Sequence, residues 1–167
     1  MESTVTSIHR LTQSRNWVYS ANSQNALSVE KELSASKYRL VQLDELIESL
    51  AGGLTPKGAT YPETGVLFLR VGNIQAHGLD LSDAVFIDRE LHNGDLKRCQ
   101  LRAGDVLLAI TGATFGKACV MPNGIGEANI NQHIVRIRTR PDLLSPHYLA
   151  LFFNSKIGMR QSQIFAT

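Results

Sequence analysis

The spacing of apolar residues changes along the chain from a helical period to a strand-like one. Near residue 43, four apolar side chains follow the i, i+3, i+4, i+7 spacing of one helix face: Leu43, Leu46, Ile47 and Leu50. Gly52 and Gly53 come directly after them, as is typical of a helix C-terminus. This pattern predicts a helix near residues 43–51, followed by a turn-rich stretch over residues 54–58.

Short apolar runs separated by glycine-containing turns dominate the chain after residue 65. They predict strands at residues 66–71, 84–87, 105–111, 117–121 and 133–138. A tight loop joins 105–111 to 117–121, so these two runs are expected to form a hairpin. Helical spacing returns near the end. Ser145 and Pro146 are expected to begin a helix at 146–153, and Ser155 to cap a last helix.

The order of these elements predicts an α+β fold: a single domain with one twisted mixed or antiparallel β-sheet and helices at its ends. Residues 1–37 are rich in Ser, Thr, Asn and Gln and have little periodicity. We interpret them as an N-terminal arm or linker with a short helix near residues 28–35. Residues 38–167 then form the folded domain.

Composition and charge fit a single globular domain with one basic segment. The chain has 167 residues, 43% of them hydrophobic, and a net charge of +2. Residues 97–140 carry seven Lys and Arg against two Asp and Glu. A basic segment can contact phosphates or can simply be a solvated face, and both interpretations stay open.

The two cysteines, Cys99 and Cys119, sit in apolar segments and are expected to be buried free thiols of a reducing compartment. No apolar run approaches the roughly 20 residues of a membrane span, and the N-terminus lacks the order of a signal peptide. We therefore expect a cytoplasmic protein without membrane contact.

Motifs for catalysis are missing from the sequence. Residues 112–118 resemble a phosphate-binding loop faintly, but Ala118 stands where a hydroxyl must hold Mg²⁺. There is no Pro-Pro pair for adenine methylation, and Pro141-Asp142 lacks the later acidic-x-Lys of a nuclease. The five histidines show no zinc-binding spacing. We therefore expect no catalytic centre, no cofactor and no metal site.

Three segments together carry a resemblance to a known family. They are Phe68–Ile74 followed by Gly78, then Leu101–Ala118, and finally Asn129–Arg138 followed by Ser145–Leu149. In this order and spacing they resemble the target-recognition domains of type I restriction–modification specificity subunits. The second segment is the most specific: Gly-Asp, an apolar strand and a Gly-x-x-x-Gly-Lys hairpin.

The resemblance implies a non-catalytic module that binds double-stranded DNA within a DNA adenine methyltransferase and endonuclease complex. Family members usually hold two recognition domains, each reading half of a split site. Spacer helices between the domains dock methyltransferase subunits, and the restriction subunit joins through these. This chain shows one recognition domain without spacer helix or second domain. A fragment, a half-subunit and part of a fused enzyme remain alternatives, and pairing with a second recognition domain is expected.

Candidate DNA contacts lie in loops beside the predicted strands, where paired donors and acceptors can read base edges. The candidates are Lys57, Arg70, Asn73, Gln75, His77, Thr111, Thr114, Lys117, Asn129, Asn131, Gln132, His133, Arg136 and Arg138. For Asn73, Asn129 and Asn131 the alternative is a turn held by side-chain-to-backbone hydrogen bonds. For Arg136 and Arg138 the alternative to phosphate contact is an exposed sheet face.

A competing hypothesis keeps the same fold but removes DNA binding. In it the chain is an interaction or regulatory module that docks a methyltransferase complex or inhibits a restriction complex. The basic segment favours DNA binding, and the low overall charge keeps the alternative open.

Overall fold

The computed structural model describes residues 24–56, 58 and 60–164. Its helices are α2 (Gln24–Ser34), α3 (Leu43–Leu46), α4 (Arg89–Asn93), α5 (Pro146–Asn154) and α6 (Lys156–Ile164), with 3-10 turns η1 (Val71–Asn73) and η2 (Lys97–Cys99). Its strands are β1 (Ile47–Gly52), β2 (Val66–Leu69), β3 (Ile74–Gln75), β4 (Gly78–Leu79), β5 (Val85–Ile87), β6 (Val106–Ala109), β7 (Ala118–Val120), β8 (Ala128–Ile130) and β9 (Ile134–Thr139).

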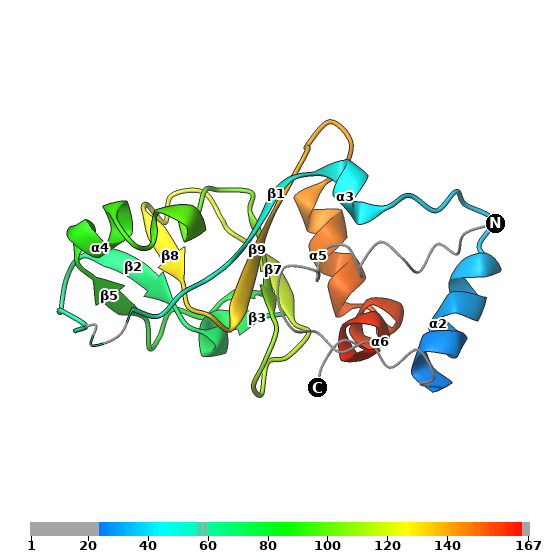
Figure 1. The fold of residues 1–167 in the computed structure, drawn as a ribbon, viewed down its shortest axis with the longest axis horizontal. Helices are drawn as coiled ribbons and strands as arrows, with labels where there is room; N and C mark the ends of the chain where they lie inside the picture. The colour runs from blue at the N-terminus through cyan, green and yellow to red at the C-terminus, as the bar shows by residue number, and fades with distance from the viewer. Residues whose placement is uncertain (1–23, 57, 59, 165–167) are drawn as a thin grey trace.

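The strands form two main sheets and a small hairpin. The four-stranded sheet has the order β1-β9-β6-β7 and is antiparallel throughout. The three-stranded sheet has the order β5-β2-β8, with β2 and β8 parallel, and β3 pairs with β4. The four-stranded sheet lies between the helices α2, α5 and α6 at one end of the molecule and the three-stranded sheet at the other (Figure 1).

The α+β class predicted from the sequence is confirmed, but the prediction of one sheet is wrong. The predicted strand 66–71 is shorter, and it belongs to a different sheet from the strands predicted at 105–111, 117–121 and 133–138. The hairpin of β6 and β7 and the helix at 146–153 are confirmed. Ser155 also caps α6 as predicted, because its Oγ accepts a hydrogen bond from the N–H of Gly158 at 3.1 Å.

The helix predicted at 43–51 is wrong beyond residue 46, because residues 47–52 form β1 and pair with β9. An irregularity between Ile47 and Ser49 shifts the register by one residue. Such a bulge changes which side of a strand the following residues face. Ile47 and Leu50 therefore both pack into the core beside α5, although they are three residues apart. The bulge therefore gives the apolar residues of this strand a spacing that is typical of a helix face.

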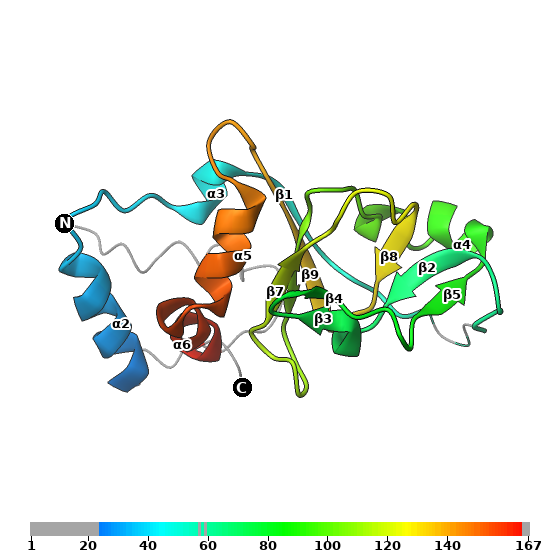
Figure 2. The same ribbon diagram turned by 180° about the vertical axis from the view of Figure 1, so that it is seen from behind.

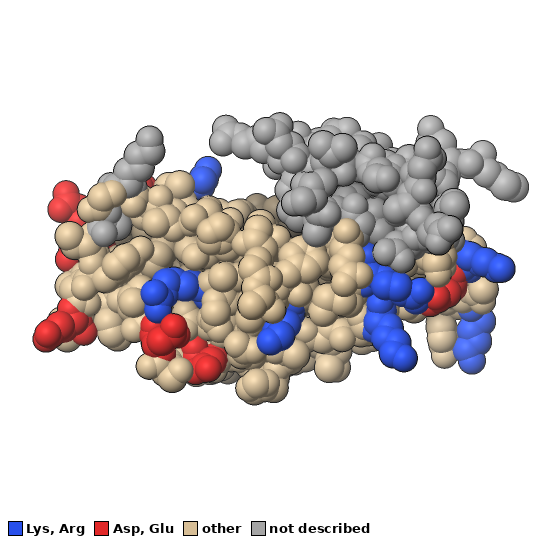
Figure 3. Space-filling view, turned by 90° about the horizontal axis from the view of Figure 1, so that it is seen from below, with Lys and Arg blue, Asp and Glu red and all other residues tan. Residues whose placement is uncertain are grey.

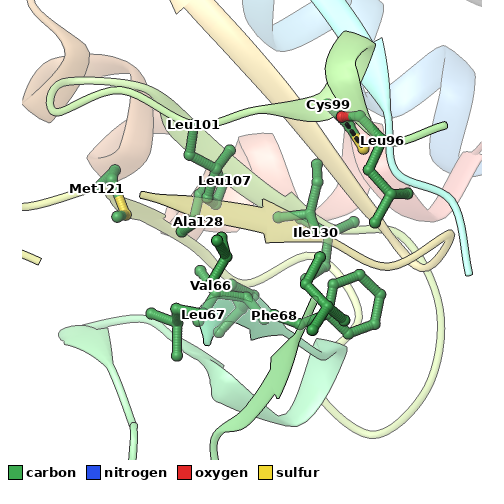
Figure 4. Close-up of a cluster of buried hydrophobic side chains, with 14 of the residues drawn as sticks. Val66, Leu67, Phe68, Leu96, Cys99, Leu101, Leu107, Met121, Ala128 and Ile130 are labelled. Atoms are coloured by element: carbon green, nitrogen blue, oxygen red, sulfur yellow. Dashed lines mark hydrogen bonds between the residues drawn. The ribbon is translucent and has the colours of Figure 1, made fainter. Parts of the chain in front are cut away.

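Two hydrophobic cores lie on opposite faces of the four-stranded sheet. Val106 and Ile137 face α5, and pack with Leu149 and Phe153. The larger core fills the space between the four-stranded and three-stranded sheets (Figure 4). Its fully buried members include Phe68, Leu69, Leu96, Leu107 and Ile130. Alternate residues of β6 thus pack into different cores, which explains why this strand is apolar along its whole length.

Helix α2 packs against α6 at the helical end of the molecule. Arg160 of α6 donates to both carboxylate oxygens of Glu32 at 2.6 Å and to the hydroxyl of Ser28 at 3.1 Å. Val29 is buried. The short helix predicted near residues 28–35 is present at 24–34. The rest of the predicted arm, residues 1–23, lies outside the described residues.

Among the described residues, no helix has the length and apolar character that crossing a membrane requires. The same part of the chain holds no group of three or more His, Cys, Asp or Glu side chains arranged to bind a metal ion.

Both thiols should react with a thiol reagent only after the protein unfolds. Cys99 and Cys119 are free and buried, as predicted from the sequence. Burial raises the pKa of Cys119 to about 12, so the native protein holds almost no reactive thiolate there at pH 8. Since the pKa is raised in the folded state, the associated stability is present below the ordinary thiol pKa and is lost as the pH rises toward 12. Rapid labelling of Cys119 in the native protein at pH 8 would contradict this expectation.

Candidate nucleic-acid interface

Three loops meet at one end of the four-stranded sheet. They are residues 53–56 after β1, 110–117 between β6 and β7, and 131–133 between β8 and β9. The antiparallel register brings them together, because Gly52 pairs with Val135 and Ala109 pairs with Ile134. Backbone hydrogen bonds then join the loops, from Gly53 N–H to Ile134 C=O at 3.0 Å and from Ile110 N–H to His133 C=O at 2.9 Å. The loops lie along the lower side of the molecule in Figures 1 and 2.

A chain of side-chain hydrogen bonds crosses these three loops. The hydroxyl of Thr55 donates to Oε1 of Gln132. The amide nitrogen of Gln132 lies 3.0 Å from Nε2 of His133, and Nδ1 of His133 lies 2.7 Å from Oγ1 of Thr111. If Gln132 donates to Nε2, the imidazole proton sits on Nδ1 and is donated to Thr111. Thr111 and Gln132 are exposed and His133 is half-buried, so this chain lies at the surface.

A second polar group lies on the other side of the 110–117 loop. Lys117 Nζ donates to Oε1 of Gln75 at 2.8 Å, and the Gln75 amide nitrogen donates to the carbonyl of Gly72 at 2.9 Å. The hydroxyl of Thr114 donates to the carbonyl of Val71 at 2.8 Å. The 110–117 loop is therefore tied to the η1 turn on one side and to His133 on the other. The exposed His77 lies between β3 and β4.

We call the accessible side chains of these segments the loop face. They combine hydrogen-bond donors and acceptors with one lysine, and each is exposed or half-buried: Thr55, Gln75, His77, Thr111, Lys117, Gln132 and His133. All except Thr55 were candidates from the sequence. Thr55 follows β1, whose apolar spacing predicts a helix, so no sequence pattern places Thr55 beside Gln132.

The structure places the three candidate asparagines inside the fold. Asn73 and Asn129 are 1% and 0% exposed, and Asn131 is 8% exposed. Asn73 accepts from the Arg70 N–H and donates to the Asp80 carbonyl and the Asp83 carboxylate, each at 2.8 Å. These contacts support the turn-holding alternative for Asn73. The side chain of Asn73 is therefore not available to a ligand at the surface.

Asn129 joins the buried parts of three elements. Its amide nitrogen donates to the Leu96 carbonyl at 2.9 Å, and its Oδ1 lies 2.5 Å from Nδ1 of the buried His92. Because the amide nitrogen points at a carbonyl, Oδ1 must be the acceptor and His92 Nδ1 the donor. Asn129 therefore fixes α4 and the segment before η2 against β8. Thr114, at 8% exposure, is likewise turned inward.

Among the remaining basic candidates, Arg70 and Arg138 are paired with carboxylates and Arg136 is buried. Arg70 is paired with Asp83 at 3.1 Å, and Arg138 forms a bidentate pair with the buried Asp105 at 2.7 and 2.8 Å. Arg136 is only 6% exposed, so the alternative of an exposed sheet face is wrong for it. Leu107, Ala109 and Ile134 lie on the same face of the four-stranded sheet and belong to the larger core, so this face of β9 is covered. Lys57 lies outside the described residues.

Charge is unevenly spread over the side of the molecule that carries the loop face. In Figure 3 most acidic side chains lie toward the end with the three-stranded sheet, with a few basic side chains beside them, and most basic side chains lie toward the helical end. The exposed Arg102 precedes β6 and the exposed Arg140 follows β9, so both lie at the opposite strand ends from the loops. The basic segment 97–140 thus does not form one continuous surface at the loops.

Comparison with solved structures finds the same fold in type I restriction–modification proteins. One match is the HsdS subunit from Thermoanaerobacter tengcongensis, with 17% identity and a TM-score of 0.50 over 98% of this chain. The chain has the HsdS fold. A second match, from a structure on complex assembly and conformational transition of the type I R-M system, has 16% identity and a TM-score of 0.56 over 98% of this chain.

The resemblance to specificity subunits expected from the three sequence segments is confirmed at the level of the fold. This chain spans about two fifths of each matched chain, 40% and 41%. No protein-family model and no curated protein matches the sequence. The HsdS fold was therefore recognisable from the order of short motifs and from the three-dimensional structure.

Proposed function

We propose that this chain is a DNA sequence-recognition module of a type I restriction–modification system. In this proposal it reads one half of a split DNA site and directs partner methyltransferase and endonuclease subunits, which supply the chemistry. The observation that carries the proposal is the loop face on an HsdS fold: surface donors and acceptors from three loops, held by mutual hydrogen bonds.

The residue types of the loop face suit base edges in the major groove. A glutamine amide offers a donor and an acceptor to adenine, and a lysine can donate to the two acceptors of guanine. Gln132 is braced from both sides by Thr55 and His133, so little side-chain freedom remains to be lost on binding. Lys117 is similarly oriented by Gln75. Both therefore present fixed polar groups from a rigid sheet.

Among the residues that the structure describes, few unpaired cations lie beside the loops, and this limits the affinity for DNA. Phosphate contacts supply most nonspecific DNA affinity, and Arg70, Arg136 and Arg138 are engaged or buried. We expect the chain alone to bind DNA near the nonspecific range, about 10⁻⁴–10⁻⁶ M at physiological salt. Partner subunits that hold two recognition domains on one duplex would raise avidity by a factor of about 10²–10⁴.

Gln132→Ala should reduce the preference for the selected DNA sequence over random duplex by about 5- to 150-fold, the effect of losing one base contact worth about 1–3 kcal/mol. The preferred sequence would first be selected from a random library with the chain assembled into a complete specificity subunit. Competition titrations would then give the preference. Gln163→Ala, which alters an exposed glutamine of α6, is the matched control and should leave the preference unchanged.

Lys117→Ala distinguishes phosphate contact from base contact in the same assay. If Lys117 touches phosphate, its loss weakens all sequences alike and lowers the slope of log affinity against log salt by about one. If no sequence is ever enriched by the assembled complex, the DNA-recognition proposal fails. The interaction-module hypothesis, with docking of a methyltransferase complex and no DNA binding, would then be favoured.

A further inference from the structure

Arg136 is a buried cation in the middle of the four-stranded sheet. It lies on β9 between Ala51 of β1 and Leu107 of β6, and only 6% of the residue is exposed. Its side chain is on the same face of the sheet as Leu107, which packs in the core between the two main sheets. This position is separate from the loop face, and nothing in the proposed DNA contacts uses it.

Within the described residues, no carboxylate pairs with Arg136. Its Nη1 donates to the hydroxyl of Ser49 at 3.3 Å, and its Nε is buried without a hydrogen-bond partner. The nearby carboxylate, Asp105, is already occupied. Both of its oxygens accept from Arg138, and one also accepts the N–H of Arg102 at 2.7 Å.

Two further arginines lie near this buried charge: Arg138 is two residues along β9 on the same face, and the backbone N–H of Arg102 is bonded to Asp105, the partner of Arg138. Burial lowers the pKa of Arg136, and repulsion by Arg138 and Arg102 lowers it further, while Asp105 acts in the opposite sense. The carboxylate of Glu48 acts on Arg138 and raises its pKa. The side chain of Arg102 is exposed to solvent. The buried carboxylate of Asp105 is paired with Arg138 alone, so the charge of Arg136 has no paired counter-ion among the described residues.

A buried charge without a counter-ion is costly, and its unsatisfied N–H groups add to that cost. We propose that Arg136, with Arg138 and Arg102 beside it, binds an oxyanion of the phosphate or sulfate type. Guanidinium groups match the oxygens of such anions through parallel N–H donors. The anion would supply the missing negative charge and accept from the unpaired Nε–H of Arg136. Its source is either a free anion or a phosphate of bound nucleic acid.

The direct test compares thermal unfolding in phosphate, sulfate and chloride at matched ionic strength. The Tm of the full chain should rise with phosphate or sulfate, by roughly 5 °C at a concentration a hundred times Kd. Arg136→Met removes the unpaired charge while keeping an apolar side chain of similar length. This variant should have a higher Tm than the original chain in chloride and should lose the response to phosphate.

Two further variants keep the test informative if Arg136→Met folds poorly. Arg102→Ala changes an exposed side chain and should weaken the phosphate response severalfold without loss of folding. Arg140→Ala, an exposed arginine beyond the end of β9, is the matched control and should respond like the original chain. The proposal is overturned if phosphate and sulfate stabilise no more than chloride does, or if Arg102→Ala and Arg136→Met respond like the original chain.

DNA titrations identify the source of the anion. If the group is a DNA phosphate, Arg136→Met and Arg102→Ala weaken binding to all duplexes, and free phosphate competes with DNA. If it is a free anion, both variants keep the DNA affinity, while the phosphate-dependent rise in Tm is lost in Arg136→Met and weakened in Arg102→Ala. Because the Tm readout uses no DNA, it can succeed even if the DNA-recognition proposal fails.

Discussion

Replacing Asp105 with alanine should lower the free energy of unfolding by about 3–5 kcal/mol, the range found when one partner of a buried ion pair is removed. Asp105 is 1% exposed and accepts three hydrogen bonds, two from Arg138 and one from the N–H of Arg102. These bonds raise the pKa of Arg138, so its guanidinium stays charged at every ordinary pH. The alanine variant would remove the carboxylate that pairs with Arg138 and that also offsets the charge of the unpaired Arg136.

The expected loss corresponds to a fall in Tm of about 10 °C for a chain of this size, measured by thermal or urea unfolding. Glu32→Ala is the matched control because Glu32 also accepts two hydrogen bonds from one arginine, Arg160. That pair is 43% and 29% exposed, so its loss should cost less than about 1 kcal/mol. A loss in Asp105→Ala no larger than in Glu32→Ala would show that the buried pair contributes little.

The pair formed by Asp105 and Arg138 also shows where sequence patterns stop being informative. Arg136 and Arg138 alternate with Val135 and Ile137 along β9, which correctly places the two arginines on one face of a strand. The alternation does not reveal what covers that face. The answer depends on a second sheet whose strands come from residues 66–69, 85–87 and 128–130, and no local pattern specifies their position.

Other strands could be predicted where their own residues show the pattern of a buried strand, and were missed where burial depends on distant residues. β6 is central and apolar on both faces, so its sequence indicates a buried strand directly. β8 is three residues long, and its middle residue, Asn129, is polar. Asn129 is compatible with burial only because His92 and the Leu96 carbonyl, more than 30 residues away, satisfy its amide. The sequence therefore indicated a polar loop candidate where the fold has a buried strand.

The sequence was sufficient to predict most residues of the loop face, but it did not predict how these residues are grouped in space. Polar residues between predicted strands were sufficient to indicate Gln75, Lys117 and Gln132 as surface candidates. Their grouping depends on which strand ends coincide, and this required the correct assignment of β1 as a strand. Once β1 pairs with β9, residues 53–56 must lie beside residues 131–133. The polar chain from Thr55 to Thr111 follows from that contact.

The contact between the end of β1 and the loop of residues 131–133 leaves no room for a side chain at Gly53. A Cβ atom added to Gly53 would overlap the backbone carbonyl oxygens of Ile130 and Asn131. Backbone atoms cannot rotate away as a flexible side chain can. In Gly53→Ala, either the end of β1 or the loop of residues 131–133 must therefore shift, and the hydrogen bond from Leu54 N–H to the Ile130 carbonyl would be strained or lost.

We expect Gly53→Ala to cost about 1–3 kcal/mol of unfolding free energy, as overpacking of a close contact does. It should also abolish the preference for the selected DNA sequence, because a polar group displaced by even about 0.5 Å loses its productive geometry. Gly52→Ala is an unusually close control: the neighbouring glycine has no atom within 4 Å of an added Cβ, so the substitution should change stability by no more than about 1 kcal/mol. Urea unfolding and competition titrations with the assembled complex measure the two effects separately. If Gly53→Ala is destabilised but keeps its full sequence preference, the loop of residues 131–133 does not read DNA, and recognition must be assigned to the other side of the 110–117 loop, at Gln75 and Lys117.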